Sequence, residues 1–112
     1  MSRFAFIATA GLLALTPAAF GESLPRYDVE TECKKIASFG GTFSNMTYVG
    51  CLDLEQSSYD GLKRRWPSVP HEMKAECRTI AEFGGGSYLT LSGCLDMEEA
   101  AARDASSKSF QY

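Results

Sequence analysis

Apolar side chains recur every three or four residues in two blocks of this chain, and each block has a short stripe followed by a long one. The short stripe of the first block consists of Val29, Cys33, Ile36 and Ala37. Its long stripe consists of Tyr48, Cys51, Leu52, Glu55, Tyr59, Leu62 and Trp66. Because this spacing puts each stripe on one face of an α-helix, the block predicts two helices. Asp28 is a candidate N-cap of the first helix, Phe39-Gly40-Gly41 ends it, and Pro67 stops the second.

The second block is a copy of the first. Residues 32–55 and 76–98 are identical at 14 of 23 aligned positions when one residue is deleted opposite Phe43. The helical stripes of the copy consist of Met73, Cys77, Ile80 and Ala81, and of Leu91, Cys94, Leu95, Glu98 and Ala102, all apolar except Glu98. Ser68 or Val69 before Pro70 marks the start of the third helix, with Pro70 as its first residue, and the fourth helix fades near Ala105. Thr42 or Ser44 is expected to cap the long helix of the first block, and Ser87 that of the second.

All four cysteines lie inside the copies, and distances along the predicted helices select their pairing. Cys33 and Cys51 each stand roughly 9–10 Å from the first turn, as Cys77 and Cys94 do from the second. Cys51 and Cys77 would stand about 22 Å and 10 Å from the Pro67 turn, a mismatch that disulfide geometry excludes. We therefore predict the bonds Cys33–Cys51 and Cys77–Cys94. The predicted fold is all-α: two tandem disulfide-stapled αα-hairpins packed as a small four-helix domain.

The first 21 residues have the features of a cleavable signal peptide. Arg3 gives a positive start, an apolar run from Phe4 to Leu15 follows, and small residues precede a predicted cleavage after Gly21. The run is shorter than the roughly 20 residues that span a bilayer, so we expect no stable membrane insertion after cleavage. Export and four cysteines favour a periplasmic or secreted protein, because disulfides form in those compartments.

The remaining chain is predicted to form a single helical domain, residues 22–106, with a flexible tail at 107–112. Repeat 1 covers residues 28–66 and repeat 2 covers residues 70–105. The first residue of each Phe-Gly-Gly turn, Phe39 or Phe83, is expected in the core at the end of its hairpin. Gly50 and Gly93 each precede a cysteine inside a helix, where glycine costs about 1 kcal/mol relative to alanine. We attribute them to the close backbone approach that a disulfide requires.

Glu55 and Glu98 occupy equivalent positions one helical turn after a cysteine. Each carboxylate comes level with the start of the preceding short helix, near Val29 or Met73, where unpaired N–H groups favour a negative charge. We therefore predict helix N-terminus contacts for both. Asp53 and Asp96 point to the opposite face and are expected to be solvated.

The chain is mildly acidic, with a formal net charge of −3, and loss of Arg3 with the signal peptide makes the remainder more acidic. This balance argues against nucleic acid or an anionic membrane as the main partner. The exception is a basic cluster, Lys63, Arg64, Arg65 and Trp66, which is a candidate surface for an acidic partner or a sugar. Its alternative explanation is structural: cations favour a helix C-terminus, and Trp66 packs between the hairpins.

The cysteines are too widely spaced for a zinc site, and the only histidine, His71, lies at a predicted helix start. We therefore predict no metal and no cofactor.

The pattern C…F-G-G…S…G-C-L-D-x-E, with Tyr59-Asp60-x-Leu62…Trp66-Pro67 joining the copies, resembles an uncharacterised family of small exported bacterial proteins with tandem cysteine-hairpin repeats. That resemblance implies no activity. More loosely, Cys51…Glu55…Tyr59-Asp60-x-Leu62…Trp66 is similar to lysozyme-inhibitor LprI-type domains. This second resemblance implies an exported, helical and cysteine-linked inhibitor, although the cysteine spacing here is longer and the second copy lacks the complete pattern.

The sequence contains no nucleophile–base pair, so we predict a non-catalytic binding module whose partner is an unknown protein or cell-wall component, with lysozyme or another cell-wall enzyme as a specific candidate. An alternative function is a metal-binding or carboxylate-based enzyme that brings Glu55 and Glu98 together across the hairpins, as helical bundles do for metals. Redox protection is a third reading, and it requires cysteines that cycle between oxidation states.

Overall fold

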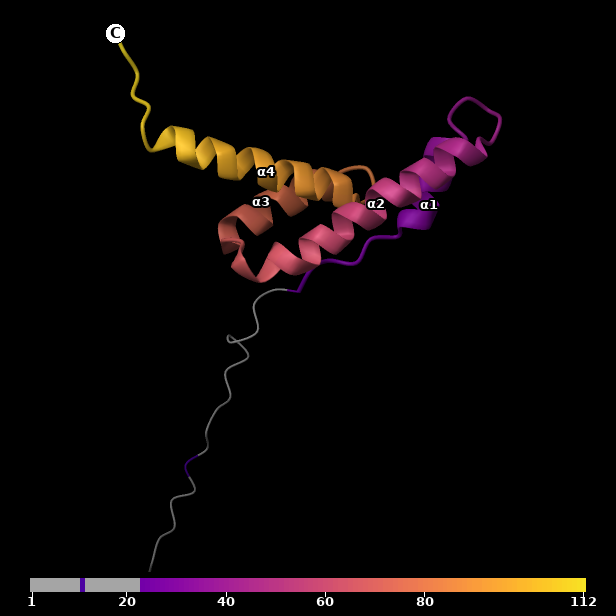
Figure 1. Cartoon of the computed structure of the whole chain (residues 1–112), viewed down its shortest axis with the longest axis horizontal. Coiled ribbons are helices and arrows are strands. Elements are labelled where there is room, and N and C mark those ends of the chain that lie inside the picture. The colour runs from indigo at the N-terminus through magenta and orange to yellow at the C-terminus, as the bar shows by residue number, and fades with distance from the viewer. Residues whose placement is uncertain (1–10, 12–22) are drawn as a thin grey trace, which may run out of the picture.

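A computed structural model describes residue 11 and residues 23–112, and Figure 1 shows helices connected by turns. The helices are α1 (Val29–Ala37), α2 (Asn45–Arg65), α3 (His71–Glu82) and α4 (Tyr88–Ala105), with a short 3-10 helix η2 (Trp66–Ser68) between α2 and α3. No strand is present among the described residues, and the predicted all-α fold class is confirmed. The predicted signal peptide, residues 1–21, lies outside the described residues except for Gly11.

Short polar side chains begin three of the four helices, as the sequence predicts. The Asp28 carboxylate accepts hydrogen bonds from the backbone N–H and the hydroxyl of Thr31, at 3.3 and 2.7 Å. Ser44 caps α2 and Ser87 caps α4, and each hydroxyl oxygen accepts from the backbone N–H three residues later at 3.1 Å. These contacts satisfy donors that a helix N-terminus leaves unpaired.

Prolines shape the connection between the hairpins. Pro67 lies inside η2, so the chain tightens into a 3-10 turn directly after α2. Pro70 adopts an extended conformation and occupies the N-cap position, and α3 begins at His71. The third helix therefore starts one residue later than predicted, because Pro70 lies outside the helix instead of forming its first residue.

Both disulfides join the two helices of one hairpin. Cys33 is bonded to Cys51 with a Cα–Cα distance of 5.6 Å, and Cys77 to Cys94 with 5.5 Å. The predicted pairing is confirmed, and the fold consists of two disulfide-stapled αα-hairpins. The described residues contain no free cysteine.

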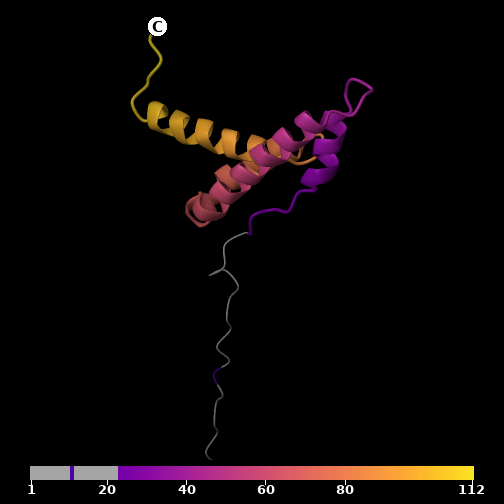
Figure 2. The same cartoon turned by 45° about the vertical axis from the view of Figure 1, so that its right-hand side comes forward.

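The two hairpins are joined mainly by their long helices. Helix α1 packs on α2, α3 packs on α4, and α2 packs on α4. The start of α4 lies against α2, and from there the rest of α4 and the beginning of α2 project in opposite directions (Figures 1 and 2). The core is therefore off-centre. Its buried residues are Leu62, Trp66, Val69, Cys77, Ala81, Tyr88, Leu91 and Leu95.

The ends of the hairpins lie outside this core, which corrects one expectation. Phe39 is 93% exposed and Phe83 is 92% exposed, so neither is a core residue. Ile36 and Ile80, on the predicted short stripes, are also more than half exposed. The reason is that, of the described helices, α1 packs on α2 alone, so its buried face is limited to Cys33 and Ala37. Periodicity gives the apolar face of a helix but not the number of elements available to cover it.

No helix among the described residues is both long and apolar enough to cross a bilayer.

The explanation given above for the glycines beside the cysteines is also corrected. A Cβ atom placed on Gly50 or Gly93 would have no neighbouring atom within 4 Å, so both positions face open space. The close approach at each disulfide does not depend on them. We have no physical account of why glycine stands at both positions.

Candidate functional site

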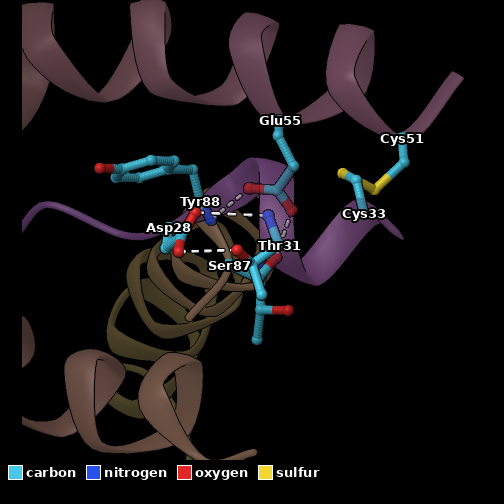
Figure 3. The surroundings of a disulfide bond; sticks show 8 residues. Asp28, Thr31, Cys33, Cys51, Glu55, Ser87 and Tyr88 are labelled. Carbon is cyan, nitrogen blue, oxygen red and sulfur yellow. Dashed lines mark hydrogen bonds between the residues drawn. A yellow bond between two sulfur atoms is a disulfide. The ribbon is translucent and has the colours of Figure 1, made fainter. Parts of the chain in front are cut away.

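The two hairpins meet around a buried carboxylate, that of Glu55 on α2. This side chain is 8% exposed and lies one helical turn beyond Cys51. Its two oxygens accept hydrogen bonds from the backbone N–H of Tyr88 at 2.7 Å and from the hydroxyl of Ser87 at 2.5 Å. Figure 3 shows Glu55 reaching from α2 to the first residues of α4, beside the Cys33–Cys51 bond. A negative charge is favourable at this place because unpaired N–H groups and the helix dipole converge there.

Glu55 thus contacts a helix N-terminus, but not the one that the sequence predicts. The prediction places it at the start of α1, whereas its hydrogen bonds go to the start of α4. Asp28 already caps α1 from within the same segment, so the donor that Glu55 would have met is satisfied. The error arises because the contact depends on how the hairpins pack, which the spacing of one hairpin does not determine.

Glu98 does not reproduce the role of its counterpart. It lies ten residues after Tyr88 on α4, about 15 Å along the helix axis, and is half-buried. Within residues 23–112 it forms no hydrogen bond or ion pair, so the predicted contact near Met73 is not made. The same separation keeps Glu98 away from Glu55 at the start of α4, and the carboxylate pair of the alternative function does not form. No group of three or more His, Cys, Asp and Glu side chains in the described part of the chain is placed to hold a metal ion.

A tyrosine cluster completes the junction. The buried Tyr88 ring lies between the rings of Tyr27 and Tyr59, with centroid distances of 4.7 and 4.8 Å. Its hydroxyl donates to the carbonyl of Pro25 and accepts from the backbone N–H of Tyr27, both at 2.9 Å. These bonds fasten the extended segment before α1 to the second hairpin. The apolar stripes do not predict this role, although the exchange of polar Asn45 for an aromatic at the equivalent position, Tyr88, is a detectable signal.

The Tyr27 hydroxyl donates to the Glu82 carboxylate at 3.3 Å. Burial and then the negative charge of Glu82 raise the pKa of Tyr27 above its usual range. This contact adds a link between the segment before α1 and the end of α3.

The turn between α3 and α4 fits this junction because it lacks side chains. A Cβ atom on Gly86 would lie 2.5 Å from the Tyr27 ring, and one on Gly85 would lie 2.6 Å from the Glu32 carboxylate. Gly85 also has a φ of +142°, which disfavours other residues. The first copy has Thr42-Phe43 in the corresponding stretch. The deletion opposite Phe43 therefore produces the one turn that is small enough to dock.

Alanine substitutions at these glycines are predicted to have opposite effects on stability. Gly50→Ala should raise the free energy of unfolding by about 0.5–1 kcal/mol, because alanine is the better helix former and the added methyl group meets nothing. Gly86→Ala should lower it by about 1–3 kcal/mol, because the methyl group overlaps the Tyr27 ring. Urea unfolding of the two oxidised variants checks both signs. A loss of stability in Gly50→Ala would restore the original explanation of close backbone approach.

Beside the junction is a cleft of about 130 Å³. It is lined from α1 and α2 by Val29, Glu32, Cys33, Ile36, Cys51 and Glu55, and from the second hairpin by Ile80, Ala81, Phe83, Gly84, Gly86, Ser87 and Thr90. The three exposed apolar side chains among them, Ile36, Ile80 and Phe83, come from both hairpins. The Cys33–Cys51 bond joins α1 to α2 and so holds the wall of the cleft that these two helices form. A second, larger hollow of about 1000 Å³ runs between the segment before α1 and α2, and the junction tyrosines line it.

The predicted basic surface is divided by the fold. Trp66 is 4% exposed and packs in the core, with the Lys74 ammonium 5.0 Å from the centre of its ring. Of the two explanations for Trp66, packing between the hairpins is therefore the one that its burial supports. Lys63 is exposed and pairs loosely with Asp60 at 3.7 Å, and Arg64 is also exposed.

Arg65 is directed at α4. Its guanidinium donates to Asp96 at 2.6 Å and to Glu99 at 3.1 Å. Partial burial lowers the pKa of Arg65, but the hydrogen bonds and charges of the two carboxylates outweigh it and raise the pKa overall. Asp96 is thus paired, against the expectation that it is only solvated. Of the four residues of the basic cluster, Lys63 and Arg64 remain on the surface.

Comparison with models of protein families, with curated proteins and with solved structures finds no match for this chain. The geometry of the described residues is therefore the basis for assigning a function.

Proposed function

We propose that this protein is an exported, non-catalytic binding module that captures a side chain of a protein partner in the cleft between its hairpins. The observation that carries the proposal is the position of Ile36, Ile80 and Phe83. These apolar side chains are 51–92% exposed, yet all three border the same cleft. Apolar residues that the core leaves exposed and that gather around a concave site are typical of a binding surface.

The size and rigidity of the cleft suit one anchoring residue. A volume of about 130 Å³ is close to that of a single aliphatic or aromatic side chain. Both hairpins are closed by disulfides, and Glu55 ties the second to the first. Because the walls are held in place before binding, little conformational entropy is lost when the anchor enters. Anchors of this kind supply much of the affinity of protein interfaces.

Two disulfides indicate an oxidising compartment outside the cytosol. We place the protein more specifically in the periplasm or the medium, where its partner is a protein or another component of the cell wall. The acidic net charge favours a basic partner. The similarity of Cys51…Glu55…Tyr59 to lysozyme-inhibitor LprI-type domains makes a lysozyme the first enzyme to test.

The test uses the oxidised protein without residues 1–21, and measures inhibition and direct binding of lysozyme at micromolar concentration. The double variant Ile36→Ser/Ile80→Ser should weaken binding at least about tenfold, because it removes two apolar walls of the cleft. Leu54→Ser is the matched control, since Leu54 is 57% exposed but does not line the cleft. Absence of both inhibition and binding rejects lysozyme as the partner. Equal losses in the cleft variant and the control would contradict the cleft as the site for whichever partner binds.

A further inference from the structure

The end of the first hairpin has a surface that neither the fold nor the cleft uses. We define the hairpin-1 tip as residues 34–49, which comprise the end of α1, the turn and the start of α2. Four of its apolar side chains are exposed: Phe39 by 93%, Met46 by 85%, Val49 by 54% and Phe43 by 44%. The turn stands at one end of the molecule, away from α3 and α4 (Figures 1 and 2). None of these four side chains lines either of the two hollows described above.

The tip is positively charged in a chain whose net charge is negative. No Asp or Glu occurs between Glu32 and Asp53, whereas Lys34 and Lys35 both lie in this stretch. Lys35 pairs with Glu32 at 2.9 Å, and no ion pair of Lys34 is found within the described residues. The second hairpin differs, because Arg78 and Glu82 near its turn pair with each other at 3.0 Å. The two copies therefore present ends of different charge.

The spacing of charged and apolar groups matches the layers of a bilayer surface. Lys35 lies four residues and Lys34 five residues before Phe39, about 6–8 Å behind it at the helical rise. Interfacial segments bury their apolar side chains about 5–10 Å deep while lysines remain among the headgroups. Asp53 lies eight residues into α2, about 12 Å from its start, which exceeds the Debye length of about 8 Å at physiological salt. Asp53 is thus largely screened from the tip, and of the two tip lysines Lys35 is the one that pairs with an acidic neighbour, Glu32.

We propose that the hairpin-1 tip binds the surface of an anionic lipid bilayer, with Phe39 and Met46 entering the boundary between headgroups and acyl chains and Lys34 facing the lipid phosphates. A second copy of the chain is a poorer occupant, because two tips would bring lysines of like charge together. The turn of the tip also stands at one end of the molecule, where a planar surface can reach it (Figures 1 and 2). The disulfide between α1 and α2 holds the tip together, so little ordering is needed on binding. The proposal does not depend on the cleft.

Vesicle flotation with the oxidised protein lacking residues 1–21 tests this inference. Vesicles of phosphatidylcholine with phosphatidylglycerol should bind the protein at low salt, and phosphatidylcholine alone should bind it at least about fivefold more weakly. Phe39→Ser should reduce binding to the anionic vesicles about tenfold, because it removes the side chain expected to enter most deeply. Phe83→Ser is the matched control: it is equally exposed but lies in the other turn, and it should change binding less than twofold.

The charge requirement is tested in the same assay. Lys34→Gln should weaken binding about fivefold, and Lys108→Gln, which alters an exposed lysine of the tail, should leave it unchanged. The inference is overturned if the protein floats with neither vesicle, or if Phe83→Ser weakens flotation as much as Phe39→Ser does. It is also overturned if Phe39→Ser leaves flotation intact and instead abolishes binding to a protein partner. Because Phe83 lines the cleft, Phe83→Ser should weaken cleft binding only, which separates failure of this inference from failure of the proposed function.

Discussion

Glu55→Gln should lower the free energy of unfolding by about 2 kcal/mol, although it hardly changes the volume of the side chain. The carboxylate accepts from two donors at the start of α4, the N–H of Tyr88 and the hydroxyl of Ser87. A glutamine has only one acceptor oxygen, so when that oxygen accepts from the Tyr88 N–H its amide N–H₂ faces the Ser87 hydroxyl, which loses its charged acceptor. The lost charge also removes a favourable interaction with the helix dipole. Guanidinium unfolding of the oxidised protein, followed by circular dichroism, gives the difference.

The repeat supplies a matched control at the equivalent position. Glu98→Gln should change the free energy of unfolding by less than about 0.5 kcal/mol, because Glu98 forms no hydrogen bond or ion pair among the described residues. Similar losses in the two variants would show that the junction does not depend on the contact between Glu55 and α4. A larger loss of stability in Glu98→Gln than in Glu55→Gln would show that Glu98, and not Glu55, is the carboxylate that stabilises the fold.

Removal of the two disulfides should destabilise different parts of the molecule. Their closed loops are almost equally long, with sequence separations of 18 and 17, so loop-closure entropy contributes about 3 kcal/mol in each case. The difference comes from packing. Cys77 belongs to the main core and Cys94 packs against it, whereas α1 packs only on α2. Replacing Cys77 and Cys94 by Ala should therefore destabilise the whole fold, and replacing Cys33 and Cys51 should release α1 first.

Hydrogen exchange followed by mass spectrometry distinguishes these outcomes. In the variant without Cys33 and Cys51, peptides from α1 should exchange rapidly while those from α3 and the first half of α4 remain protected. In the variant without Cys77 and Cys94, protection should fall across all four helices. Uniform loss of protection in both variants would contradict the unequal packing of the two hairpins.

The parts of this fold that depend on short stretches of sequence were predictable. Helix positions follow from the 3.6-residue period, and the caps at Asp28, Ser44 and Ser87 follow from side chains that accept from nearby N–H groups. The disulfide pairing was also predictable, because two helices joined by a short turn run antiparallel and place residues level with each other by simple counting. Each of these features is decided within one hairpin.

Features that depend on the packing of the two hairpins were not predictable. The partner of Glu55 belongs to the other hairpin, and so do the contacts of Tyr88. Burial of Trp66 was one of two readings, and only the position of α3 and α4 decides between them. The exposure of Phe39 has the same origin, since no other element among the described residues packs on the turn of the first hairpin. A period along the chain carries no information about such neighbours.

The two copies are thus alike in construction and different in use. The second copy docks its glycine turn against the first and contributes most of the core. The first copy keeps its turn free, with Phe43 as the additional residue and Phe39 beside it. The second copy therefore contributes more to the core, and the turn of the first stays exposed.

Amide hydrogen exchange at Tyr88 and Asn45, two equivalent positions at the starts of α4 and α2, tests this asymmetry most directly. The Tyr88 N–H is buried and bonded to Glu55, whereas the start of α2 is exposed. In a single NMR experiment on the oxidised protein, the Tyr88 amide should exchange as slowly as the core helices do, and the Asn45 amide should exchange at nearly the rate of an unfolded chain. Rapid exchange at both amides would contradict the docking of the second hairpin on the first.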